Sequence, residues 1–252
     1  MPIPFLGPIG IILFSVYMII LFIGAIALFR RAAKTESDLK QIKVYNVSLG
    51  LFILFLGLAY LIRTYFMFFI ANDDIELLNQ LTATERTLEA LPDYIDGRLG
   101  ILQVSWQWHM AVIFLGIAFL VFATEYLMFR KTKFLITIIS FATIPLVVAF
   151  PYDIAHDIYF GMYISPVLWL FVYIQVARQS TGSVRKNAIM LVVGVAIFIV
   201  GVFMNSSTVR GWFFPEVDFH VNELGAVFSA WIAPIVLIIG SIVTISAIFN
   251  KF

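Results

Sequence analysis

The chain contains no cysteine among its 252 residues. This absence excludes disulfide bonds, thiolate nucleophiles and cysteine-ligated metals. Charge is also scarce, because Asp, Glu, Lys and Arg together make up 12% of the sequence while 62% is hydrophobic. A soluble domain of this composition would expose a large apolar surface to water. The sequence therefore predicts an integral membrane protein, with the lipid bilayer as its surroundings and no nucleic-acid partner.

Seven stretches have about the 20 apolar residues that a helix needs to cross a bilayer, although the fourth is near the minimum. Their approximate bounds are 8–30, 44–71, 101–129, 133–150, 156–178, 187–206 and 224–250. The apolar runs are continuous and lack period-two alternation, which favours helices over membrane β-strands. We therefore predict an all-α bundle of seven transmembrane helices, formed by residues 1–252 as a single domain.

The positive charges are segregated along the chain. Twelve of the 16 Lys and Arg residues lie in the segments 30–43, 130–133 and 178–186 and at Lys251, and only three lie in the alternate loops. The positive-inside rule makes the first group cytoplasmic. The N-terminus is then predicted to be outside and the C-terminus cytoplasmic, in a multi-pass protein of the cell membrane.

The longest predicted connection, residues 72–100, lies on the outer side. Its segment 73–91 carries apolar residues at roughly helical spacing and ends before Pro92. Such a pattern predicts a further helix, either as an extension of the second span or lying over the mouth of the bundle.

One positive charge, Arg63, lies within a predicted span, in the stretch "AYLIRTYFMFF". Arginine stays protonated, so it requires a partner, a water-filled cavity or a route to the interface. The third span begins with "LQVSWQWHM", where helical spacing places Gln103, Trp106, Gln107 and His109 on one broad arc and Trp108 on the other side. We expect this arc to face the bundle interior at a depth similar to that of Arg63.

The fifth span opens with "FPYDIAHDIYFGMY", which places Asp153, His156 and Asp157 on one face with Tyr159 beside it. The third histidine of the chain, His220, follows the sixth span. All three histidines are therefore predicted on the outer side, together with most of the carboxylates.

Three hypotheses account for these residues. In the first, Arg63 pairs with Asp153 or Asp157 in an outer-half polar cavity that binds a small molecule or lipid. The predicted ligand-binding residues are Arg63, Gln103, Trp106, Gln107, His109, Asp153, Asp157 and Tyr159. In the second hypothesis, His109, His156 and His220, with Asp153 or Asp157, bind zinc and activate water. In the third, Arg63 is a structural anchor satisfied by carbonyls or by snorkelling, and the histidines are ordinary interfacial residues.

Covalently bound retinal is excluded, although seven spans with an outer N-terminus match the topology of rhodopsins. The predicted seventh span contains no lysine, and all seven lysines lie in predicted cytoplasmic segments. Polar residues are sparse in the inner half of the spans, which disfavours a pump or channel. We therefore expect a non-enzymatic, receptor-like sensor, or a membrane subunit that contacts a protein partner at the basic cytoplasmic loops. The alternatives are a secondary transporter and a zinc-dependent membrane hydrolase.

Overall fold

The computed structural model describes residues 8–36, 39–65, 93–128, 134–150, 154, 158, 164–204 and 231–249. Over these residues the protein is all-helical and forms seven helices. They are α1 (Pro8–Lys34), α2 (Lys40–Tyr65), α4 (Asp93–Met128), α5 (Leu135–Ala149), α7 (Ile164–Gln179), α8 (Gly182–Met204) and α11 (Ala233–Phe249).

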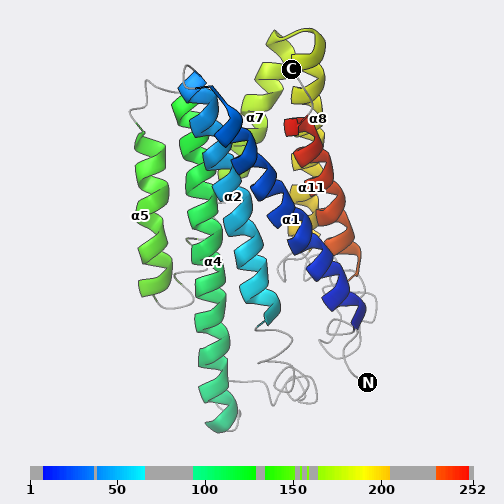
Figure 1. Ribbon diagram of the computed structural model, residues 1–252. Coiled ribbons are helices and arrows are strands. Elements are labelled where there is room, and N and C mark those ends of the chain that lie inside the picture. The colour runs from blue at the N-terminus through cyan, green and yellow to red at the C-terminus, as the bar shows by residue number, and fades with distance from the viewer. Residues whose placement is uncertain are drawn as a thin grey trace.

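Successive helices run in alternating directions, as Figure 1 shows. As a result, the ends of α1 and α7 and the starts of α2 and α8 lie at the same end of the molecule. The basic residues of these termini gather there, and we call it the basic end. They are Arg30, Arg31, Lys34, Lys40, Lys43, Arg178, Arg185 and Lys186.

The helices are arranged as a ring with one helix outside it. Around the ring, α4 packs on α2, α2 on α1, α1 on α11, α11 on α8 and α8 on α7, and a smaller contact between α7 and α4 closes the circuit. Helix α5 packs on α4 from outside (Figure 1). Polar side chains that face the ring interior are thereby removed from lipid.

The helix bounds differ from the predicted spans mainly at the start of α4. This helix begins at Asp93, directly after Pro92, whereas we predicted a loop up to residue 100. Polar residues extend an α-helix readily once it leaves the apolar layer, and acidic residues in its first turn complement the helix dipole. Hydrophobicity marks the part of a helix that lies in lipid and not the whole helix. The predicted outer helix 73–91 lies outside the described residues.

The outer surface of the bundle is apolar. On α1 the exposed side chains follow one another every three or four residues, as expected for a single helix face. They are Ile9, Ile12, Val16, Ile19, Ile23 and Ile26. By length and composition, α1, α2, α8 and the Gln107–Tyr126 part of α4 can each cross a membrane, while α5 and α11 are shorter apolar helices. These features are those of a polytopic membrane protein.

Glycines set the closest helix contacts. Gly50 and Gly57 lie against phenylalanine rings of α1, and Gly194 and Gly201 lie against α11, as expected for small residues at the interfaces of membrane helices. Gly240 of α11 provides the closest approach to another helix's backbone, since a Cβ atom there would lie 2.6 Å from the Phe198 backbone nitrogen.

Replacing Gly240 by alanine is expected to lower the stability of the bundle by about 1–3 kcal/mol, the usual cost of overpacking. The added methyl meets backbone atoms of α8, so the two helices must separate. Gly57→Ala is the matched control, because its Cβ would meet the Phe22 ring at 3.1 Å and that side chain can rotate away. Thermal unfolding in one detergent compares the two, and equal melting temperatures would contradict the prediction.

Candidate functional site

His109 connects α4 to α2 inside the ring. Its side chain is buried, and its Nδ1 atom lies 2.6 Å from the carbonyl oxygen of Ala59. A carbonyl can only accept a hydrogen bond, so Nδ1 carries a proton and donates it. In a regular helix the same carbonyl accepts the backbone N–H of Arg63. The His109 imidazole and the Arg63 backbone N–H therefore share the Ala59 carbonyl as their hydrogen-bond acceptor.

The Arg63 guanidinium lies close enough to His109 to interact with it electrostatically. Arg63 is half-buried in the last turn of α2, and its neighbour Thr64 is buried. With Nδ1 protonated, a neutral ring leaves Nε2 as a hydrogen-bond acceptor.

Two tyrosines extend the contacts of His109 to α1. The Tyr60 ring of α2 meets the His109 ring edge-on at 5.9 Å and the Tyr17 ring of α1 edge-on at 4.9 Å. Tyr17 is fully buried, and Ser241 of α11 lies within reach of its hydroxyl, although the geometry falls short of a hydrogen bond. We call Tyr17, Ala59, Tyr60, Arg63 and His109 the His109 group. It joins α1, α2 and α4.

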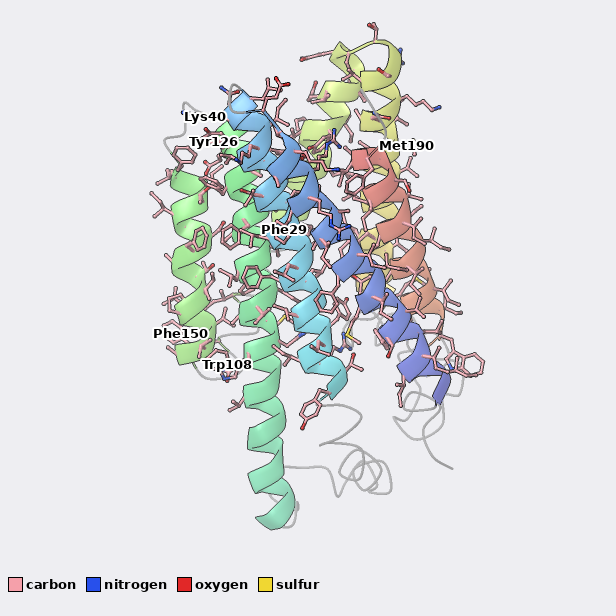
Figure 2. The ribbon with its side chains drawn as sticks, in the orientation of Figure 1. Phe29, Lys40, Trp108, Tyr126, Phe150 and Met190 are labelled. Carbon is pink, nitrogen blue, oxygen red and sulfur yellow. The ribbon has the colours of Figure 1, made fainter. Side chains whose placement is uncertain are left out.

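The polar arc at the start of the predicted third span is buried where its side chains are described, but Gln107 does not face the ring interior as predicted. Gln107 and His109 are buried, while Trp108 is 54% exposed. Gln107 Nε2 donates a hydrogen bond of 2.7 Å to the carbonyl of Phe150, at the end of α5. Figure 2 shows Phe150 beside this part of α4. Gln107 thus serves the α4–α5 contact, away from the ring interior.

The remaining predicted site residues are only partly placed. Gln103 and Trp106 belong to α4, but their side chains lie outside the described residues. Asp153, Asp157 and Tyr159, predicted as further ligand-binding residues, also lie outside them, as do His156 and His220 of the zinc hypothesis. Within the described ranges, His, Cys, Asp and Glu residues form no group of three that is suited to a metal. The cavity and zinc hypotheses therefore stay predictions.

Glu125 is a buried carboxylate with a structural explanation. It is 2% exposed, and intramembrane carboxylates often mark a functional site. Its oxygens accept hydrogen bonds from the backbone nitrogens of Ile136, at 3.3 Å, and Thr137, at 2.8 Å, and from the Thr137 hydroxyl. Phe134, which precedes α5 with φ 61°, makes no side-chain cap. Glu125 therefore caps α5 from the neighbouring helix and complements its dipole.

A second polar group lies near the basic end, where we predicted few polar residues. Arg31 of α1 donates a hydrogen bond to the carbonyl of Ile248 in the last turn of α11. The hydroxyls of Tyr45, on α2, and Tyr173, on α7, are hydrogen-bonded to each other, and Arg31 acts electrostatically on Tyr45. Asn46 is 3% exposed, and its Nδ2 has no hydrogen-bond partner in the described structure. We call Arg31, Tyr45, Asn46 and Tyr173 the basic-end cluster.

Sequence reasoning missed these contacts because their partners are backbone groups or lie on helices distant in sequence. Ala59, Phe150 and Ile248 contribute carbonyls, which no side-chain pattern reveals. Tyr17 and Tyr60 lie within the first and second predicted spans, where their spacing marks no site. Helical spacing identifies only the face on which such residues lie.

Comparisons with known proteins add no family to these observations. A scan against protein-family models matches none, and searches of curated proteins and of solved structures return no significant match.

Glu125→Leu is expected to lower stability by about 1–3 kcal/mol, because buried donors at the start of α5 lose their acceptor. Glu125→Gln should cost less, since the amide oxygen still accepts a hydrogen bond. Glu36→Leu is the control, because Glu36 is exposed at the end of α1. The measurement is thermal unfolding of the purified protein. If Glu125→Leu and the Glu36→Leu control have the same melting temperature, the proposed capping role of Glu125 is wrong.

Proposed function

We infer that the protein is a multi-pass membrane protein whose outer-facing polar pocket, built around Arg63 and His109, binds a small molecule or lipid. Binding there changes the packing of the bundle, and a protein partner reads that change at the basic end. The protein then acts as a receptor-like sensor or as the responding subunit of a membrane complex. Its chemistry is binding and conformational change, without catalysis.

The observation that carries this proposal is the meeting of Arg63 and His109 at the Ala59 carbonyl. A cation and an imidazole inside an apolar bundle are costly to bury, and membrane proteins generally retain such groups for function. Here the group also connects α1, α2 and α4, through Tyr60 and Tyr17. A ligand that contacts it therefore acts on three helices at once.

A secondary transporter is the second candidate, and the basic-end cluster favours it. A transporter needs polar groups in both halves of the membrane, and this cluster supplies them in the half opposite the His109 group. Between the two groups the interior face of α2 carries Leu49, Ile53 and Leu56, all buried. This apolar layer spans about 10 Å along the helix at 1.5 Å per residue. Transport requires it to open, whereas a sensor can work with it closed.

Seven spans with an outer N-terminus and a cytoplasmic C-terminus are part of this proposal. Because the chain has no cysteine, single cysteines can be introduced without removing others. With a membrane-impermeant maleimide on intact cells, Asp96→Cys at the start of α4 should be labelled. Thr181→Cys, in the α7–α8 turn, should be labelled only after permeabilisation. The reverse labelling pattern would overturn the proposed orientation. Labelling of both cysteines on intact cells would show that the two positions lie on the same side of the membrane.

Arg63→Gln should abolish the thermal stabilisation produced by a ligand of the outer pocket. Compounds and lipids that stabilise the wild-type protein in a thermal-shift screen are retested on the variant. We expect at least roughly tenfold weaker binding, since hydrogen bonds to charged groups contribute about 1.5–3 kcal/mol. Arg185→Gln is the control, because it removes the same positive charge at the basic end, away from the outer pocket. If Arg63→Gln folds and binds every such ligand as before, the pocket proposal fails.

A further inference from the structure

The basic-end cluster has more hydrogen-bond donors than acceptors. The Arg31 guanidinium has one acceptor among the described residues, the Ile248 carbonyl. The hydroxyls of Tyr45 and Tyr173 are hydrogen-bonded to each other. Asn46 Nδ2 has two hydrogens and no acceptor in the described structure. A buried donor without a partner costs about 1–3 kcal/mol, so an acceptor is expected from outside the described chain.

The unpartnered amide is on the side of α2 that faces α1 and Arg31. Helical spacing places Asn46 on the face of Ile53, which is seven residues further along. Ile53 contacts the Gly24 position of α1. Gly50, which lies between Asn46 and Ile53 on α2, packs against Phe29 of α1. Arg31 follows Phe29 on the same helix and reaches Tyr45 electrostatically. The donors of the cluster thus converge on the region between α1, α2 and α7.

The charge of this region is positive. Exposed Arg30 and Lys34 lie on α1 around Arg31, and the termini of α2, α7 and α8 bring further basic residues to the same end. A ligand that satisfies these donors must carry several acceptor oxygens and negative charge. A phosphate group has both properties, and basic pockets between transmembrane helices are known to hold lipid phosphates.

We propose that the basic-end cluster is a phosphate-binding site in which Arg31 and Asn46 donate to the phosphate oxygens, beside the Tyr45–Tyr173 pair. The phosphate belongs either to the headgroup of an anionic lipid or to a free anion. This site is separate from the Arg63 pocket. It joins α1, α2, α7 and α11, so its occupancy stabilises the closure of the ring at this end.

The test uses the whole chain in dodecyl maltoside, a detergent without phosphate. In one arm, phosphatidylglycerol is added to the detergent, and native mass spectrometry counts the molecules that stay bound. In the other arm, inorganic phosphate is added at constant ionic strength and the melting temperature is followed. Retention of phosphatidylglycerol alone identifies a lipid headgroup, and stabilisation by inorganic phosphate identifies a free anion. If neither arm responds, the proposal is overturned.

Asn46→Leu is the decisive variant because it changes no charge. In dodecyl maltoside without added phosphate its melting temperature should equal or exceed that of the wild type, since an unpartnered donor is removed. Its retention of the phosphate probe should fall roughly tenfold, as expected for loss of a hydrogen bond to a charged group. Ser48→Ala is the matched control, a buried polar residue on the other side of α2. Wild-type retention by Asn46→Leu, or a lower melting temperature without phosphate, would overturn the site.

Arg31→Gln and Arg30→Gln separate the site from general surface attraction. Both remove one positive charge from the same turn of α1, but Arg31 is half-buried and Arg30 is exposed. At 0.5 M salt, which screens surface charge, only Arg31→Gln should lower retention, again roughly tenfold. Equal losses would show surface attraction only and overturn the proposal. Arg63→Gln should leave the phosphate response unchanged, so failure of the outer pocket remains distinguishable from failure of this site.

Discussion

In hydrocarbon, a polar group that leaves water must find its hydrogen-bond partner inside the protein, and this constraint organises the bundle. For four of the described polar side chains that partner is backbone of another element. His109 binds the Ala59 carbonyl, Gln107 binds the Phe150 carbonyl, Arg31 binds the Ile248 carbonyl, and Glu125 accepts the first N–H groups of α5. Three of these four contacts lie at a helix end, where backbone groups have no partner within their own helix. These four side chains therefore act as connections between helices.

The attachment of α5 shows the effect of this arrangement. The helix has 15 residues, is highly apolar and lies outside the ring. Apolar packing against α4 fixes its distance from the ring but gives little control over its position along the helix axis, because lipid solvates its outer face equally well at any height. Glu125 holds its first turn and Gln107 its last carbonyl, so two polar contacts set that position. Near these contacts Figure 2 shows Tyr126 towards one end of α5 and Phe150 at the other.

Length and hydrophobicity were sufficient to predict where the described helices lie, because both follow from local solvation. They were insufficient for the start of α4, where polar residues remain helical outside the apolar layer. The faces of Gln107, Trp108 and His109 followed from helical spacing, but the contact of each did not. A periodic pattern gives a direction around one helix axis and carries no information about which neighbour lies there. The role of Glu125 cannot be predicted for this reason, since the partner of its carboxylate is the start of a different helix, α5.

The two polar groups and the layer between them constrain how the protein can respond to a ligand. Arg63 and Tyr45 are separated by whole turns of α2 and face the same side of it, so both point towards the ring interior. Leu49, Ile53 and Leu56 between them are buried against one continuous core that includes Leu191, Val195 and Leu237 of the opposite helices. Such a core is close-packed and changes between discrete arrangements more readily than it deforms gradually. A small displacement of α2 at Arg63 therefore reaches Tyr45 as a movement of the whole helix, and the cross-helix contacts of Tyr45 and Arg31 are the first to register it.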